Sequence, residues 1–388
     1  MKSSRIAALV SMLLLIGTVS LLPADQVEDT RAAMNKIVYD LNDNSYKSFH
    51  AAISQKDMTG RILGSHNISP EVAASFAQSF DATMESWFGA SFPDMGGAEI
   101  VGMLVNFELE GNKGKALVRF RLPHYRYSYH LYELQLDRRG RLIIVDWLDY
   151  FQAYRFSDFA GLSLVCAMPT AMAARSLLSI SPITTNDIFQ TRELLKAFRD
   201  SAHERFFSIL DDMNEPLQRD PFIVDLRVRV AGVARELDRY QESMLELMKH
   251  YPDNDLYALS YVDYYMWSNQ YARALSSLQR FQKSIGIDDG ATLSRMSALA
   301  LALGDVENSA AFAARATTYE PALELGWWSL LRAQSSAEDF ADATETLAHL
   351  EDHFGRTLDA AKLRKDRFRG FLKLAASQEF KDWRVSRE

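Results

Sequence analysis

Asn269-Gln270-Tyr271-Ala272-Arg273-Ala274 begins a pattern that recurs twice downstream, as Gly304-Asp305-Val306-Glu307-Asn308-Ser309 and as Glu338-Asp339-Phe340-Ala341-Asp342-Ala343. The three copies start 35 and then 34 residues apart. Apolar or small residues follow each start at the same two distances: Leu278, Ala313 and Leu347 at the first, and Phe281, Ala316 and Leu350 at the second. A period of this length predicts stacked helical hairpins, because each hairpin buries its apolar face only against its neighbours.

This register resembles the tetratricopeptide repeat, whose second helix starts after a Gly-Asp-Tyr-like turn and carries small residues where it crosses the first helix. Pro321 occupies the closing-proline position of that motif, and Trp327 occupies its first-helix tryptophan position. Another unit is expected over residues 221–254, and a helical pair precedes it over about 187–213. The resemblance implies an all-α solenoid of helical hairpins over residues 187–388.

Upstream of the solenoid the period of the apolar residues changes. The pattern is helical over about residues 27–88, whereas apolar and polar residues alternate from 101 to 147, with turn sequences at 111–114 and 137–140. Alternation with a period of two is typical of strands. Residues 25–155 are therefore expected to form an α+β domain, in which helices pack on a four-strand antiparallel sheet.

The order of these elements is similar to the cone-shaped fold of the nuclear transport factor 2 and ketosteroid isomerase superfamily. Enzymes of that superfamily use a carboxylate or a histidine as general base inside an apolar cavity, assisted by a Tyr or Asp donor. His124, His130, Asp146 and the tyrosines of residues 125–132 are the groups that could serve in this way. Histidines and tyrosines of sheets are more often structural, so catalysis is the less favoured interpretation.

One predicted strand carries tyrosines at alternate positions and then changes parity. Tyr125, Tyr127 and Tyr129 would face one side of a regular strand, whereas Tyr132, Leu134 and Leu136 would face the other side together with His130. A β-bulge near His130 and Leu131 would bring all the apolar groups to one side. We favour that bulge, or burial of the tyrosines beneath the repeats, over an open ligand platform. Tyr125, Tyr127, Tyr129 and His130 are thus candidates for an interface or a pocket.

Between the two halves, residues 156–186 form an apolar connector. Pro169 and Arg175 argue against a membrane span there, so we expect a buried helix or helix pair that joins the halves. Cys166 is the only cysteine, and its apolar neighbours indicate a small hydrophobic residue rather than a nucleophile. A single cysteine also excludes an intrachain disulfide framework.

Residues 1–24 have the pattern of an export signal. Lys2 and Arg5 precede an apolar run, and Ala24 is a small residue at which cleavage is expected. The sequence therefore predicts an exported protein, periplasmic or secreted. Leu22, at the third position before the cleavage site, is bulkier than the small residue usual there. A form anchored by an uncleaved signal is therefore the alternative, and it is the one membrane attachment that we expect.

Composition and motifs exclude several classes of function. The formal net charge of -8 disfavours nucleic acid as a partner, because binding phosphates requires clustered Lys and Arg. Neither a Gly-x-Ser-x-Gly elbow nor a phosphate loop nor a dinucleotide fingerprint occurs. Glu345, His349 and His353 follow one helix face, but the repeat register places them on the outer, solvated side. We therefore expect no enzyme activity, no cofactor and no metal site.

The concave groove of such a solenoid is lined by the first helix of each hairpin, and this groove is the candidate site for a protein partner. The residues predicted to line it are apolar, aromatic or charged: Leu256, Leu259, Asp263, Met266, Leu325, Trp328 and Arg332. The sequence thus predicts an exported interaction scaffold or adaptor of the cell envelope. The alternative is a small-molecule-binding or isomerase-like N-terminal domain for which the repeats serve as a docking module.

Overall fold

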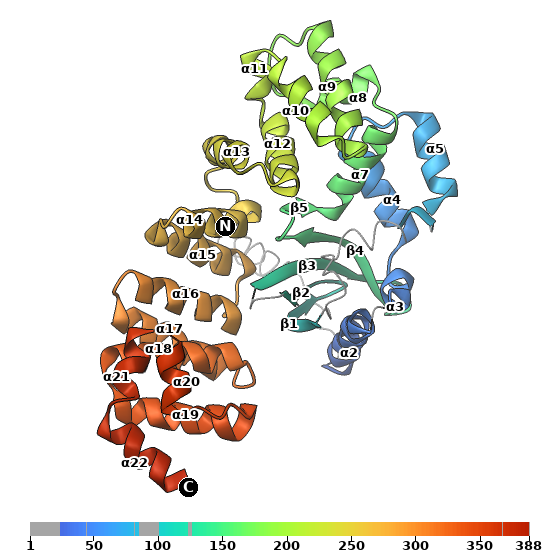
Figure 1. Cartoon of the computed structure of the whole chain (residues 1–388). Helices are drawn as coiled ribbons and strands as arrows, with labels where there is room; N and C mark the ends of the chain where they lie inside the picture. Colours follow the sequence, from blue (N-terminus) through green and yellow to red (C-terminus); the bar gives the residue numbers. More distant parts are fainter. Residues whose placement is uncertain are drawn as a thin grey trace, which may run out of the picture.

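The computed structural model describes residues 24–43, 45–80, 82–84, 101–122, 126–366 and 368–387. An antiparallel sheet packs with one face against N-terminal helices and with the other against an arc of helical hairpins (Figure 1). The N-terminal helices are α2 (Ala24–Asn42), α3 (Lys47–Ala51), α4 (Gln55–Ser65) and α5 (Pro70–Gln78). The predicted fold class, an α+β domain followed by all-α hairpins, is confirmed.

The sheet has the order β1-β2-β3-β4-β5. Its strands are β1 (Val101–Glu110), β2 (Lys113–Leu122), β3 (Arg126–Leu136), β4 (Leu142–Asp149) and the short edge strand β5 (Tyr154–Arg155). Four of them form the predicted meander. Trp147, which is fully buried on the helix-covered face, stacks on Phe156 with ring centroids 3.8 Å apart. This face holds the core of the N-terminal domain.

The connector is a pair of helices, α7 (Phe156–Ala167) and α8 (Ala171–Leu177). Helix α7 contacts α4 on one side and α9 (Thr185–Arg199) on the other, so it joins the two halves of the chain. Cys166 is buried there, and burial raises the pKa of its thiol to about 12. At neutral pH the thiol is therefore protonated and a poor nucleophile.

Four successive hairpins make up the centre of the solenoid. They are α12 (Pro221–Ala234) with α13 (Leu237–His250), α14 (Ala258–Trp267) with α15 (Tyr271–Ile285), α16 (Gly290–Ala302) with α17 (Val306–Tyr319), and α18 (Glu324–Ala337) with α19 (Phe340–Phe354). The second helices start at intervals of 34, 35 and 34 residues. The predicted register is confirmed, and the hairpins are similar to tetratricopeptide units. The flanking helices are α10 (His203–Asp211), α11 (Glu215–Gln218), α20 (Ala360–Lys365), α21 (Arg369–Leu374) and α22 (Gln378–Arg387).

The same left-handed turn joins the two helices of every hairpin. Its central residues are Arg235, Asn269, Gly304 and Glu338, with φ of 59°, 57°, 80° and 61°. In each case the amide of the next residue donates to a carbonyl of the last helical turn, as Glu236 N does to Ala231 O at 3.0 Å. This arrangement is the Schellman ending of a helix, and glycine is the residue that adopts it at least cost.

The tyrosine strand β3 does not contain the predicted bulge. Its pairing with β2 is continuous from Lys113↔Gln135 to Leu122↔Arg126, whereas the irregularity beside β4 falls between Glu133 and Leu134. The prediction of a bulge near His130 and Leu131 is therefore wrong, whereas the stated alternative, burial of the tyrosines beneath the repeats, is confirmed for Tyr127 and Tyr129. A bulge is unnecessary because both faces of the strand are buried. Tyr132, Leu134 and Leu136 face the helices, and Tyr127 and Tyr129 lie beneath the repeats.

A buried ionic cluster joins the sheet to the solenoid. Arg119 on β2 donates to Asp289 at 2.5 Å and to both carboxylate oxygens of Glu320 at 2.7 and 2.6 Å. The Tyr129 hydroxyl donates to the second oxygen of Asp289 at 2.6 Å, and Asp289 also caps α16 by accepting from Thr292 N at 2.8 Å. Burial opposes the charge of Arg119, but the hydrogen bonds to Glu320 and the charge of Asp289 outweigh it and raise its pKa. The cluster fixes how the sheet sits against the repeats.

The predicted export signal falls on residues 1–24, of which 1–23 lie outside the described residues. No helix among the described residues is both long enough and apolar enough to span a membrane. Tyr125 and His124 also lie outside the described residues.

Candidate functional site

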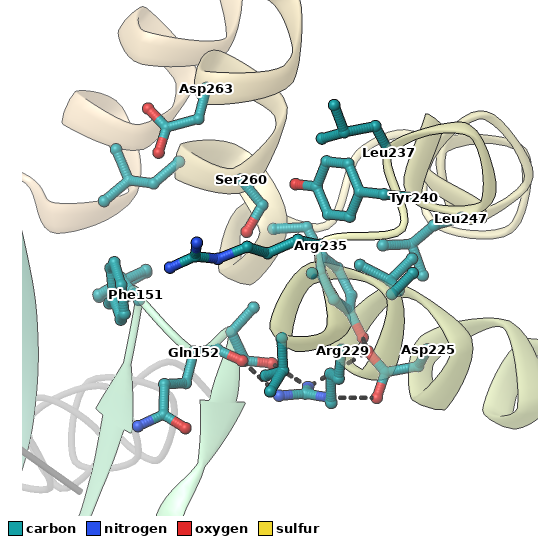
Figure 2. A pocket seen from close by; sticks show the side chains of 18 of the residues that line it. Phe151, Gln152, Asp225, Arg229, Arg235, Leu237, Tyr240, Leu247, Ser260 and Asp263 are labelled. Atoms are coloured by element: carbon teal, nitrogen blue, oxygen red, sulfur yellow. Dashed lines mark hydrogen bonds and ion pairs between the residues drawn. The ribbon is translucent and has the colours of Figure 1, made fainter. Parts of the chain in front are cut away.

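The largest cavity that we describe opens where the sheet meets the solenoid. It has a volume of about 710 Å³ and is bounded by the turn between β4 and β5 and by helices α12, α13 and α14 (Figure 2). Tyr127 of β3 also lines it. A half-open cavity of this size is in the range of ligand sites, which commonly form where two structural units meet.

The turn between β4 and β5, residues 150–153, forms the sheet side of the cavity and is fixed at both ends. Asp149 accepts hydrogen bonds from the amides of Phe151 and Gln152 at 2.8 and 2.9 Å. On the other side, Arg229 of α12 donates to the carbonyls of Gln152 and Ala153 at 2.5 and 3.1 Å. The turn is thereby held against α12 by these hydrogen bonds.

Arg229 is itself neutralised within the chain. It forms an ion pair with Asp225 one helical turn earlier, at 2.8 Å, and Asp225 also accepts from the Tyr257 hydroxyl at 2.9 Å. Burial lowers the pKa of Arg229, but the nearby Asp225 carboxylate more than compensates and raises it. For the Tyr257 hydroxyl, by contrast, burial itself raises the pKa, and the charge of the Asp225 carboxylate raises it further. Arg229 and Tyr257 therefore keep one charge state over the physiological pH range, and Arg229 serves to position the turn.

Apolar side chains remain exposed around the cavity. Phe151 is 41% exposed, Val233 is 72% exposed and Leu237 is 60% exposed. Tyr240 and the buried Leu247 continue the apolar lining inward. Large apolar side chains that gather at the edge of a cavity, rather than being scattered over the surface, mark a site where a ligand or partner binds.

Two further charged groups lie at the cavity. Arg295 of α16 pairs with Asp263 of α14 at 2.8 Å. Arg235 ends α12 in the left-handed turn, and Figure 2 shows its side chain pointing across the cavity. Among the described residues the side chain of Arg235 has neither a hydrogen-bond partner nor an ion-pair partner, although its backbone amide donates to the Gly232 carbonyl at 3.4 Å. The cavity therefore combines apolar walls with one uncompensated positive charge.

The residues predicted to line the groove lie in several different environments. Leu259 and Asp263 line the cavity. Leu256 and Leu325 are half-buried and pack into the core shared with the sheet, and the exposed Met266 lies with its sulfur 3.6 Å from Arg295. Trp328 is half-buried and donates to Glu324 at 2.9 Å. Arg332 lines a second, smaller cavity of about 270 Å³ between α16 and α18.

Of the other predicted candidates that the structure describes, Tyr127 lines the cavity and the rest lie away from it. Tyr129 belongs to the ionic cluster with Asp289. His130 is fully buried on the opposite face of β3, with Nδ1 3.0 Å from the Tyr132 hydroxyl. Asp146 is fully buried and accepts from the hydroxyl of Ser157 at 2.7 Å. His130 and Asp146 are thus both fully buried and do not line the cavity.

The candidate metal ligands of the solenoid do not form a site. The His349 ring stacks on Trp327 with centroids 3.6 Å apart, and His353 and Glu345 are exposed. No group of three His, Cys, Asp or Glu side chains among the described residues is arranged to hold a metal ion.

Sequence reasoning missed most of the cavity, although the repeat register contained the signal. The residues 34 positions before Leu259, Asp263 and Met266 are those of the preceding hairpin: Asp225, Arg229 and Gly232. All three line the cavity. By contrast, nothing in the sequence indicated that Phe151 and Gln152 would lie beside them, because that contact depends on how the sheet docks.

Comparison with family models found no match, and comparison with curated proteins found none either. Among solved structures, a mutant form of MamA is 14% identical, with a TM-score of 0.33 over 44% of this chain and 96% of that one. "MamA MSR-1 C2" is 13% identical, with a TM-score of 0.34 over 44% and 97%. "Crystal structure of PilW, widely conserved type IV pilus biogenesis factor" is 13% identical, with a TM-score of 0.32 over 52% and 99%. Likenesses this weak carry no functional inference.

Proposed function

We propose that this chain is a non-enzymatic interaction scaffold whose concave helical groove binds a segment of a partner protein. The observation that carries the proposal is the cavity between the turn 150–153 and the first helices α12 and α14, with its exposed apolar rim. A bulky side chain of the partner would enter the cavity as an anchor, and the rest of the segment would follow the groove.

Two features support a protein segment as the ligand. The cavity is half-open and is lined by the first helices α12 and α14, and the second cavity, beside Arg332, lies between the first helices α16 and α18. Stacked hairpins present an extended surface of this kind, and extended surfaces suit chains better than compact small molecules. The hydrogen bonds of the turn 150–153 form this wall of the cavity before any ligand binds, and a preorganised site favours affinity.

We further propose that the scaffold works in the cell envelope. The charged start and apolar run of residues 1–24 support export. Sequencing the N-terminus of the protein purified from its own cells should give Asp25 as the first residue. An intact Met1 in a soluble cell fraction would contradict export, and an intact Met1 in the membrane fraction would indicate the anchored form.

Filling the cavity should abolish partner binding without unfolding the chain. A Cβ added at Gly232 would lie 3.7 Å from the Tyr240 ring, an ordinary contact, so Gly232→Phe is expected to fold and to occupy part of the cavity. Peptides enriched from a random displayed library on the full chain should bind this variant at least about tenfold more weakly, since an anchor side chain contributes about 1–3 kcal/mol or more. Isothermal titration calorimetry provides the measurement.

The matched control is Gly64→Phe in α4, where a Cβ would meet nothing within 4 Å and which lies outside the cavity. It should bind the enriched peptides like the wild type. Equal binding by Gly232→Phe and Gly64→Phe would show that the cavity is not the site. A library from which the full chain enriches nothing would count against the scaffold itself.

A further inference from the structure

We infer that the partner segment carries an acidic side chain directly beside its bulky apolar anchor, and that Arg235 binds this acid. The inference rests on the proposed function, since it specifies the ligand of the same cavity. It adds a charge requirement that apolar burial alone would not impose.

Residues at the position of Arg235 in two of the other hairpins do have side-chain partners. The equivalent residue of the last hairpin, Glu338, pairs with Lys373, and Asn269 of the second hairpin accepts a hydrogen bond from Tyr271 at 2.8 Å. Arg235 instead points across a cavity (Figure 2), and its side chain has no partner among the described residues. Its guanidinium is available to a ligand.

The charge balance of the cavity favours an anion. Arg229 and Arg295 are paired with Asp225 and Asp263, so these four charges cancel locally. Arg235 leaves one positive charge at the cavity of a chain whose formal net charge is -8. Arg235 is exposed, so a carboxylate of the ligand could reach its guanidinium and form charge-assisted and potentially bidentate hydrogen bonds with it.

The surroundings of Arg235 restrict the kind of anion. Val233 and Leu237, on either side of it in the chain, are largely exposed and apolar, and Phe151 lies on the sheet side of the cavity. The ligand must therefore present a large apolar group close to its negative charge. One guanidinium matches one carboxylate side chain, whereas a phosphate backbone or a chain terminus is usually held by several donors.

Selection from the random displayed library tests the inference directly. Peptides enriched on the full wild-type chain should place Asp or Glu next to an aromatic or large aliphatic residue, and replacing that acid by its amide should weaken binding about tenfold. The Arg235→Glu variant should lose the preference and enrich Lys or Arg at the same position. Glu338 adopts the equivalent left-handed turn, so glutamate at this position is compatible with the fold.

The control is Arg364→Glu, which makes the same change of net charge on the exposed face of α20, outside the cavity. It should keep the wild-type preference for acids. Two results would overturn the inference: enriched peptides without the acid, or an acid preference that survives in Arg235→Glu. If those peptides still fail to bind Gly232→Phe, the scaffold stands and only the charge requirement falls. If the acid acts only at the peptide's free C-terminus, which amidation of the peptide reveals, the inference of a side-chain acid is wrong.

Discussion

Asp289→Ala is expected to destabilise the folded chain by about 3–5 kcal/mol, the cost of removing one partner from a buried ion pair. Asp289 is 0% exposed and is the shared acceptor of Arg119 and Tyr129 from the sheet. The same carboxylate caps α16 through Thr292 N. The substitution leaves Glu320 as the carboxylate that pairs with Arg119, and it leaves the Tyr129 hydroxyl with Thr292 Oγ1 at 3.1 Å in place of a carboxylate, so the sheet should dock less firmly on the solenoid.

Urea unfolding followed by circular dichroism measures the change, with the neighbouring Asp288→Ala as matched control. Asp288 pairs with the half-exposed Arg315 at 2.7 Å, and a pair of that kind contributes at most about 1 kcal/mol. Similar losses for the two variants would show that the ionic cluster does not hold the halves together. Sheet and solenoid unfolding in separate transitions in Asp289→Ala would show that the cluster is what couples them.

The hairpins could be predicted from the sequence because their order is local. Successive helices contact their neighbours in the chain, so the apolar period and the recurring turn at Asn269, Gly304 and Glu338 are enough to set the register. The strands were predictable for the same reason, since turn residues and alternation mark each hairpin of the sheet. These levels of structure depend on neighbours within a few tens of residues.

The faces of the sheet could not be assigned in this way. The parity change between Tyr129 and Tyr132 is compatible with a bulge or with burial on both sides, and only contacts with distant residues decide between them. Arg119 and Asp289 are 170 residues apart, and no feature of either sequence context indicates the other. The cavity also depends on how the sheet packs against the solenoid. Its solenoid side could therefore be predicted from the repeat register, whereas its sheet side could not.

Asp149→Ala should have the second large effect, and it should affect both stability and binding. Asp149 is 1% exposed, and its Oδ1 accepts from the amides of Phe151 and Gln152 while its Oδ2 lies 3.5 Å from Nε2 of the buried His130. Loss of these contacts in a buried setting is expected to cost about 3–5 kcal/mol. The turn 150–153 should then depart from its position against Arg229, and the cavity wall should lose its shape.

Asp149→Asn separates the two consequences. An asparagine side-chain oxygen can still accept from both turn amides, so this variant should keep the turn and bind the enriched peptides within about threefold of the wild type. Its stability should fall less than that of Asp149→Ala, because the hydrogen bonds of the turn amides are kept. Asp149→Ala should bind them at least about tenfold more weakly, measured by calorimetry under conditions in which circular dichroism shows the chain folded. Unchanged binding by folded Asp149→Ala would mean that the turn does not shape the site, and that the ligand is held by α12 and α14 alone.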